Sequence, residues 1–292
     1  MRFRTEIELR NAPFRLETEG SVLLLGSCFS TNIGEKMEAG WSGKVTANPC
    51  GVVYNPASIG LLIQLALSHR TQRRAIVEQS LTRREGKWVS WFMDSKAAGD
   101  SGEECVDNVM EKLDMLEESL ETSSVLIVTF GTPWVWLLKG TDCAVGNCHK
   151  HPDREFERQR LEIVDIVNLW KSLAEGIRER NEKLKIIFTV SPVRYLSEGF
   201  AENQRLKSIL LLTCEELTKG IADTDYFPAY EILNDDLRDY RFYGEDLRHP
   251  NSQAVDYVWE KFCGYYLDKT SLEKLKNKER ESLRSSHRKI LW

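Results

Sequence analysis

The fold is decided near the N-terminus by the stretch Ser21-Val22-Leu23-Leu24-Leu25-Gly26-Ser27-Cys28. Its continuous apolar run, which stops at Gly26, is typical of a strand buried on both faces of a parallel sheet. The following residues, 27–39, carry Ile33 and Met37 at helical spacing, so we expect a helix directly after the strand. Strand, glycine turn and helix together predict the first unit of a doubly wound α/β fold.

The same pattern recurs along the chain. Buried strands are expected at 124–130 and 185–192, with a weaker one at 225–230. Helices are expected at 56–68, 103–120, 162–180, 203–220 and 252–267. We interpret 82–102 as an irregular excursion and 139–160 as loop-like at first. The alternation predicts a single-domain, doubly wound and mostly parallel α/β sheet in a flavodoxin-like three-layer arrangement.

The length of 292 residues is enough to bury a large core in one such domain. We expect an N-terminal extension at 1–20, the domain at 21–267 and an exposed, charged helical tail at 268–292. The composition, 41% hydrophobic and 29% charged, is that of an ordinary globular protein.

Charge and hydropathy narrow the class of partner. A net charge of −5 argues against nucleic acid, because phosphate binding needs a basic surface. No window reaches the ~18 apolar residues that a membrane span requires. Residues 1–20 mix Arg and Glu and lack the apolar core of a signal peptide. We therefore expect a cytoplasmic protein with neither nucleic acid nor membrane as partner, and the sequence leaves its oligomeric state open.

The seven cysteines do not predict a metal site. Cys143 and Cys148 are the closest two, with His149 and His151 beside them. A zinc site usually draws its ligands from two compact pairs, and this chain has one such cluster. We expect reduced thiols, no metal and no cofactor.

Two polar segments at opposite ends of the chain form a candidate site. In open α/β sheets, ligands bind where strands end and helices begin, which places Ser27 and Cys28 at such an edge. A nucleophile on a strand-to-helix turn is exposed and is favoured by helix N-terminal N–H groups. Asp246 and His249, three residues apart, have the spacing of a base and the carboxylate that orients it.

Each segment alone has a simpler interpretation. A Gly-Ser pair after an apolar strand is usually a turn, and Asp-x-x-His-Pro is common in helix-capping loops. Their joint occurrence, with the nucleophile early and Asp-x-x-His late, has the chain order of the SGNH hydrolases.

Several motifs then resemble one family, the GSCFA family. They are GSCFS at 26–30, NPCGVVYNP at 48–56, TFGTPW at 129–134, NCHK at 147–150, TVSPVR at 189–194, YFPAYE at 226–231 and LRDYRFY at 237–243, followed by DLRHP at 246–250. Ser30 stands where that family usually has Ala. The resemblance covers roughly residues 20–265, and it implies a place in the SGNH/GDSL hydrolase superfamily without an established substrate.

The attacking atom is open between two residues. An ungapped alignment with the Gly-Asp-Ser of GDSL enzymes puts Cys28 at the nucleophile position, and a shift by one puts Ser27 there. We favour Cys28, since a thiol is the better nucleophile if the helix dipole or an imidazolium lowers its pKa. The alternative is that Cys28 is a small buried hydrophobe and Ser27 a helix cap.

Oxyanion stabilisation needs donors aimed at the developing charge. Gly51 is a candidate for the glycine N–H of the hydrolases. The chain has Gly-Thr-Pro-Trp at 131–134, where those enzymes have Gly-x-Asn-Asp. Thr132, Asn48 and Asn147 are the candidates to replace the missing Asn.

Two further segments have alternative interpretations. His149, followed by a Lys, is either part of an anion-recognising loop or a loop histidine held by hydrogen bonds. Residues 239–243 combine aromatic and basic side chains that suit a sugar or phosphate. The same side chains suit an Arg–carboxylate network that fixes the catalytic loop, and for Arg241 and Tyr243 we favour this structural role.

The leading hypothesis is an acyl-transfer enzyme, an esterase or O-acyltransferase, acting on a small acyl ester or acylated sugar. Cys28 or Ser27 would attack, His249 would move the proton and Asp246 would orient His249. The carbohydrate substrate is an analogy with relatives. The alternative is a non-catalytic ligand-binding or interaction module that retains the hydrolase fold, which the missing Asn favours.

Overall fold

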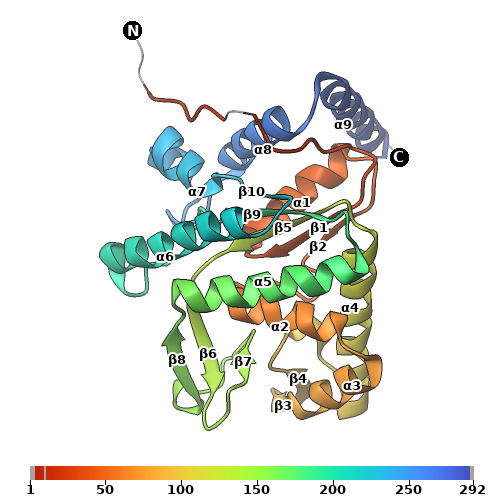
Figure 1. The fold of residues 1–292 in the computed structure, drawn as a ribbon, viewed down its shortest axis with the longest axis vertical. Coiled ribbons are helices and arrows are strands. Elements are labelled where there is room, and N and C mark those ends of the chain that lie inside the picture. Colours follow the sequence, from red (N-terminus) through yellow and green to blue (C-terminus); the bar gives the residue numbers. More distant parts are fainter. Residues whose placement is uncertain (1–3, 10, 290–292) are drawn as a thin grey trace.

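A computed structural model describes residues 4–9 and 11–289, with side chains up to residue 281. Its centre is a sheet of five parallel strands in the order β2–β1–β5–β9–β10 (Figure 1). The bounds are β1 Val22–Gly26, β2 Val45–Ala47, β5 Val125–Phe130, β9 Lys185–Val190 and β10 Thr224–Tyr226. In chain order this is 2-1-3-4-5, the flavodoxin-like order, and the predicted α/β fold class is confirmed.

Helices cover both faces of the sheet. The helices are α1 Cys28–Gly40, α2 Pro56–Leu67, α3 Arg70–Gln79, α4 Gly102–Thr122, α5 Ile163–Arg180, α6 Gly199–Gly220, α7 Ala229–Glu231, α8 Ser252–Tyr266 and α9 Lys269–Lys289. Short 3₁₀ turns occur at Ser95–Ala97, Asp153–Glu155 and Tyr240–Phe242, and a π-helical turn at Ile232–Leu237. All the predicted helices and strong strands are present.

Alternation along the first strand builds two separate cores. Leu23 and Leu25 of β1 point into the cluster formed with α2, α4, α5 and α6. Val22 and Leu24 point into the cluster formed with α1 and α8. Since successive strand residues face opposite sides, an unbroken apolar run is what a strand between two helical layers requires. Figure 1 shows the sheet between these two layers.

Two small sheets lie mostly in the segments 82–102 and 139–160, which the sequence predicted to be irregular or loop-like; β6 precedes the second segment. One is the hairpin of β3 Leu81–Arg84 and β4 Lys87–Ser90. The other joins β6 Trp134–Leu138 to β7 Ala144–Val145 and β8 Phe156–Arg160. Strand β8, Phe-Glu-Arg-Gln-Arg, buries Phe156 and leaves its other side chains partly or fully exposed. It therefore lacks the apolar run that marks a core strand. Helix α3 was missed for a similar reason, because Arg73 occupies its buried face.

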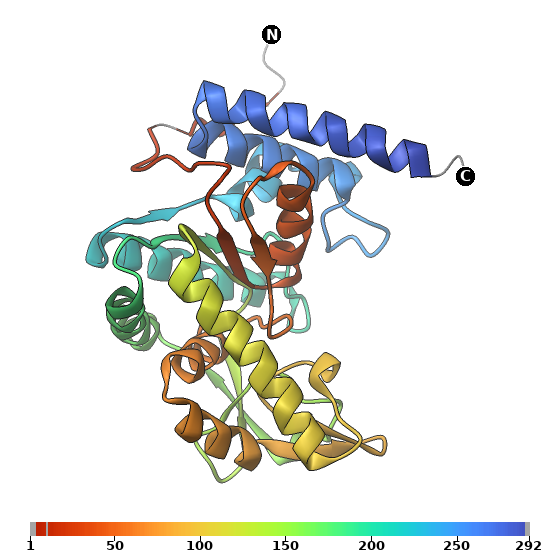
Figure 2. The ribbon, with the colours of Figure 1, turned by 90° about the vertical axis from the view of Figure 1, so that its right-hand side faces the viewer.

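The C-terminal helix is not the exposed tail that we expected. Leu275 of α9 is 2% exposed and packs toward Gly40 at the end of α1. The Trp259 indole of α8 also donates to Glu279. Figure 2 shows α9 lying along α8 at one end of the molecule. Among residues 269–281, most charged side chains face solvent, and a few apolar ones at helical spacing dock the helix.

The N-terminal extension runs along the same layer, where Leu16 N–H donates to Tyr266 O at 3.0 Å. The division into 1–20, 21–267 and 268–292 stays a prediction. In the part of the chain that the structure describes, no helix has the length and apolar character to cross a membrane.

The close approach of β1 and β5 makes a stability prediction at Gly26. This residue has φ of +125°, and a Cβ there would lie 2.2 Å from Thr129 O. Gly86, in the β3–β4 turn, also has positive φ (+83°), but a Cβ there meets no described atom within 4 Å. Gly26→Ala should therefore lower the free energy of unfolding by at least ~2 kcal/mol more than Gly86→Ala.

Urea denaturation followed by circular dichroism measures both losses. Gly86→Ala carries the cost of a left-handed backbone alone, roughly 1–2 kcal/mol, and so isolates the steric part at Gly26. Equal losses in the two variants would contradict the close packing of the two strands.

Candidate active site

The turn after β1 is held by Asn48. Its Oδ1 accepts the Gly26 N–H at 2.8 Å, and its Nδ2 donates to Thr31 Oγ1 at 3.0 Å and Ser27 O at 3.4 Å. The Ser27 N–H donates to Thr129 O at 3.2 Å. These bonds tie the turn to both neighbouring strands, so the first residues of α1 have little freedom to move.

The two candidate nucleophiles differ in what their side chains do. Ser27 is 1% exposed, and its Oγ accepts the Phe29 N–H at 3.3 Å as the N-cap of α1. This is the capping role considered for it from sequence. Cys28 is partly exposed, stands at the first helical position and lines a pocket with Ser27. Of the two, Ser27 uses its side chain as a helix cap, whereas the Cys28 thiol has no capping role.

The pocket has a volume of about 240 Å³ and brings together segments that are distant in sequence. His249 lines it together with Cys28. Its remaining wall comes from the loop after β2, the loops after β5 and β9, and the small sheet of β6, β7 and β8: Tyr54, Asn55, Gly131, Thr132, Trp134, Trp136, Val145, Gly146, Cys148, Ser191, Val193, Arg194 and Tyr195. The carboxyl edge of the sheet and the loop near residue 249 therefore meet, as the candidate site requires.

A tight loop presents the imidazole. His249 Nδ1 hydrogen-bonds Asp246 Oδ2 at 2.5 Å, while Asp246 Oδ1 accepts the N–H groups of Arg248 and His249 at 3.0 Å each. Leu247 takes φ of +57°, which turns the chain so that Asp246 and His249 face each other. These bonds to the carboxylate lower the pKa of Asp246, with the His249 side chain as the largest cause. An ionised Asp246 leaves Nε2 of the imidazole available as a base.

Burial dominates the acidity of the Cys28 thiol. It raises the pKa of Cys28, and the nearby charge of Asp246 raises it further. The N–H groups of Cys28 and Phe29, and the charge of Lys207, act in the opposite direction with smaller effect. The expected lowering of this pKa by the helix dipole is present but is outweighed. A thiol of this kind needs a base to take its proton.

A sequence profile of the GSCFA family matches residues 21–262, which is most of the chain. The chain belongs to the GSCFA family. No curated protein sequence matches it. Among solved structures, this GSCFA chain is similar to a carbohydrate esterase family 3 protein from Talaromyces cellulolyticus and to a serine-to-alanine mutant of an acetyl esterase with an acetate ion. Each has a TM-score of 0.38 and 10% identity, covering 88% of this chain and 99% of the other.

A buried lysine under the pocket was missed in the sequence. Lys207 of α6 is 1% exposed, and its Nζ donates to Gly131 O and Ser191 O at 2.8 Å each. Burial lowers the pKa of Lys207 to about 7, while the neighbouring Cys28 acts to raise it. The signal was available: Lys207 falls on the buried face of α6 with Leu210.

Of the predicted oxyanion donors, Thr132 lines the pocket and Gly51, Asn48 and Asn147 do not. Gly51 N–H donates to Asn48 O at 2.9 Å, and the side chain of Asn48 holds the Gly26 turn. Neither residue is among those lining the pocket. Thr132 does line it; its N–H donates to Tyr54 O, and its Oγ1 accepts the Trp134 N–H at 3.2 Å. The hydroxyl proton of Thr132 is left to donate.

Asn55 supplies the pocket amide that sequence reasoning missed. It is 6% exposed, lines the pocket and caps α2, with Oδ1 accepting the Ser58 N–H at 2.8 Å. Its Nδ2 donates to Ser58 Oγ at 3.0 Å. A primary amide has two N–H donors, so one remains after this bond.

The segment with Asn147 and His149 shapes the wall of the pocket. Asn147 Oδ1 accepts the His149 N–H at 2.8 Å, and His149 Nε2 hydrogen-bonds Ser90 O at 2.8 Å. Burial lowers the pKa of His149. His149 is 6% exposed, which agrees with a loop histidine held by hydrogen bonds. Neither residue lines the pocket, although their neighbour Cys148 does.

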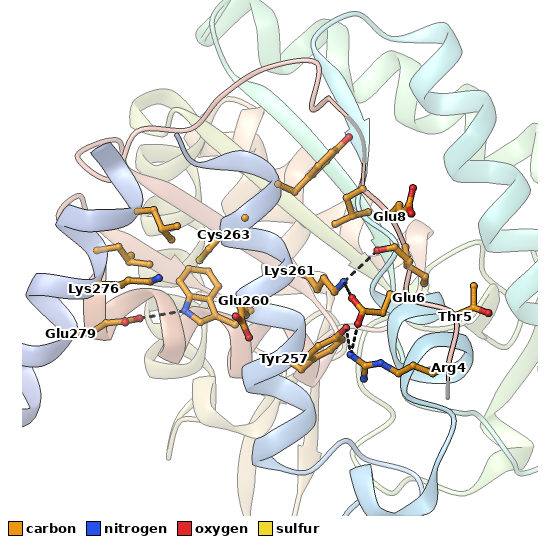
Figure 3. A pocket seen from close by; sticks show the side chains of 17 residues that line it. Arg4, Thr5, Glu6, Glu8, Tyr257, Glu260, Lys261, Cys263, Lys276 and Glu279 are labelled. Carbon is orange, nitrogen blue, oxygen red and sulfur yellow. Dashed lines mark hydrogen bonds and ion pairs between the residues drawn. The ribbon is translucent and has the colours of Figure 1, made fainter. Parts of the chain in front are cut away.

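A larger cavity of about 1280 Å³ lies between the N-terminal segment, α8 and α9 (Figure 3). Its walls are held by structural contacts, including Lys261 Nζ to Ile7 O at 3.3 Å and Arg4 to Tyr257 Oη at 3.2 Å. Burial raises the pKa of Cys263, the one thiol in it. Because no histidine is among the described residues that line this cavity, we place the candidate site in the smaller pocket.

Opposite charges near Cys28 predict opposite effects on its reactivity. At a pH below about 7, where Lys207 is charged, its cation favours the thiolate, so Lys207→Met should slow alkylation of Cys28 by iodoacetamide several-fold. As the pH rises past the pKa of Lys207, the rates of Lys207→Met and wild type should converge. Asp246→Asn removes an anion that raises the pKa of the Cys28 thiol. It should therefore accelerate alkylation at every pH at which Asp246 of the wild type is ionised.

Peptide mass spectrometry, which distinguishes Cys28 from the other six thiols, measures these rates. Thermal melts of both variants show whether the fold is retained, since Lys207→Met leaves two carbonyls without a donor. Rates that differ by the same factor at all pH values would show that Lys207 acts on Cys28 only through structure.

Proposed function

We propose that this GSCFA protein is an acyl-transfer enzyme that cleaves a small acyl ester through Cys28, His249 and Asp246. The observation that carries the proposal is that Cys28 and His249 line one pocket, although they lie near opposite ends of the domain's sequence. The Asp246–His249 pair supports a base with a defined tautomer.

In the first step, His249 Nε2 takes the proton of the Cys28 thiol as sulfur attacks the carbonyl carbon of the ester. A C–S bond forms, and the carbonyl electrons move to oxygen. When the tetrahedral intermediate collapses, the C–O bond to the alcohol breaks, and the His249 imidazolium returns its proton to the leaving oxygen. The products of this step are an alcohol and an acyl thioester on Cys28.

Three donors around the pocket are suited to the oxyanion. The Cys28 N–H is at the first turn of α1, where helical N–H groups have no intrahelical partner. The Thr132 hydroxyl and the second N–H of Asn55 line the same pocket. Such preorganised donors are typically worth ~3–4 kcal/mol each in acyl-transfer enzymes. We propose that Asn55 and Thr132 together replace the Asn of the hydrolase motif.

In the second step, water or a hydroxyl group attacks the thioester carbon, and His249 takes its proton. The C–S bond breaks, and the thiolate takes the proton back from His249. With water the product is a carboxylic acid; with a sugar hydroxyl it is a new ester. The side chains of Trp134, Trp136 and Tyr54 in the wall support an acylated carbohydrate as substrate, since aromatic faces suit sugar rings.

The proposed reaction uses groups of this chain alone. We propose that it takes place in the cytoplasm. All seven cysteines are unpaired, which suits a reducing compartment.

Hydrolysis of para-nitrophenyl acetate separates the roles of the two candidate nucleophiles. Cys28→Ala should lower kcat/KM by ~10³-fold or more, and His249→Ala by roughly 10²–10⁴-fold. Ser27→Ala should keep activity within about tenfold of wild type while losing ~1 kcal/mol of stability, because its hydroxyl caps α1.

Intact-mass measurement after an acid quench provides a second readout. An acyl group on Cys28 is expected in the wild type and is expected to be absent in Cys28→Ala. If Ser27→Ala abolishes turnover and Cys28→Ala does not, the nucleophile is Ser27. Wild-type protein that forms neither product nor thioester would favour the non-catalytic binding module.

A further inference from the structure

One charged side chain lines the pocket without an assigned role. Arg194 follows β9 in the segment Ser191-Pro192-Val193-Arg194, and it lines the same pocket as Cys28 and His249. Of the described residues that form this wall, Arg194 is the one with a permanent charge, and none is an Asp or Glu. A largely apolar pocket that is lined by a guanidinium and by no carboxylate favours an anion next to that guanidinium.

The guanidinium has no carboxylate within ion-pair distance among the residues whose side chains the structure describes. Its Nε donates to Asn234 Oδ1 at 3.1 Å, and its Cζ lies 5.5 Å from the ring of Tyr243 and 5.9 Å from that of Phe200. Arg158, which stacks on the Trp134 ring of the same wall at 3.8 Å, is paired with Glu198 instead. An arginine in a pocket wall is usually neutralised by a carboxylate, as Arg158 is by Glu198.

A network holds Arg194 in place. Asn234 Oδ1 also accepts the Tyr243 hydroxyl at 3.3 Å, and Asn234 Nδ2 donates to Tyr230 O at 2.9 Å. With Nε fixed, the two terminal NH₂ groups remain as a fork that matches an oxyanion. Tyr243 therefore supports Arg194, which gives the aromatic-basic segment at 239–243 a structural role near the pocket.

A second hollow lies on the other side of Arg194. It has a volume of about 280 Å³ and is lined by Asp235, Asn234 and Tyr230 among others. The carboxylate of Asp235 makes that hollow unfavourable for an anion. The fork of Arg194 is thus more favourable for an anion on the side of Cys28.

We propose that Arg194 forms an anion subsite, so that the ester cleaved at Cys28 carries a carboxylate or another oxyanion next to its reacting group. The proposal rests on the proposed acyl-transfer function. It names a substrate class, an anionic ester such as the half-ester of a dicarboxylic acid or the acyl ester of an acidic alcohol. Arg194 contacts the non-reacting part of this substrate and acts through binding.

Two pairs of esters test this subsite and locate the charge. Para-nitrophenyl hydrogen adipate against para-nitrophenyl hexanoate places the anion on the acyl side. Para-acetoxybenzoate against para-acetoxybenzamide places it on the alcohol side. In the wild type one of the pairs should show a preference for the anionic member, and Arg194→Gln should reduce that preference in kcat/KM by about tenfold or more. Arg158→Gln, the matched control, should leave the ratio within each pair unchanged.

Alkylation of Cys28 tests the subsite without ester turnover. Iodoacetate is an anion and iodoacetamide its neutral analogue, and both transfer a carbon to sulfur with loss of iodide. The ratio of their rates at Cys28 should exceed that of N-acetylcysteine in the wild type and should fall several-fold in Arg194→Gln. Arg194→Lys should retain part of the preference. The wild-type comparison stands even if neither variant folds.

The outcomes separate the two proposals. Loss of iodoacetate preference in Arg194→Gln without any ester turnover in wild type would support the anion subsite and overturn the acyl-transfer function. Ester turnover with equal anionic and neutral preference in wild type and Arg194→Gln would retain the function and overturn the subsite. A wild-type iodoacetate ratio at or below that of N-acetylcysteine overturns the subsite as well.

Discussion

The candidate site depends on the close approach of two strands where β1 ends. Gly26 can take φ of +125° beside Thr129 because it has no Cβ, and its N–H is bound by the side chain of Asn48. This contact fixes the direction in which the chain enters α1. Cys28 consequently stands at a helix N-terminus, at the edge of the sheet where β5 and β9 also end. A wider turn would move the thiol away from the ends of these two strands.

The electrostatics of the pocket are a balance between burial and local charge. Burial raises the pKa of the Cys28 thiol, while helix N–H groups and Lys207 partly offset it. Lys207 is itself costly to bury as a cation, and its Nζ satisfies two carbonyls at strand ends, Gly131 O and Ser191 O. The result is a thiol with a raised pKa beside a candidate base, His249, whose carboxylate partner has a lowered pKa. This arrangement favours proton transfer during attack over a preformed thiolate.

The fold was predictable from sequence to the extent that elements bury long apolar faces. The strands β1, β5 and β9 bury continuous apolar runs, the helices α2, α4 and α5 bury apolar side chains at helical spacing, and the positions of all six were predicted. Elements stabilised by charged side chains paired with distant residues were not predicted. Helix α3 uses buried Arg73 against Asp114 and Glu117, and β8 uses Arg158 stacked on an aromatic ring, so neither has an apolar period. The docking of α9 rests on few apolar residues in a charged helix.

The sequence by itself determined the α/β class, the family and the candidate pair of Ser27-Cys28 early in the chain and Asp-x-x-His late in it, because each is written in local patterns and chain order. Only the tertiary structure decided that, of the two candidates that line the pocket, Ser27 is buried as a helix cap and Cys28 is partly exposed. It also decided that Asn48 binds both Gly51 and the Gly26 turn, and that Asn55, Lys207 and Arg194 gather around the thiol. The physical reason is that a side chain's role is set by which of its hydrogen bonds and charges are already satisfied. Those partners come from strands and loops that are distant in the chain.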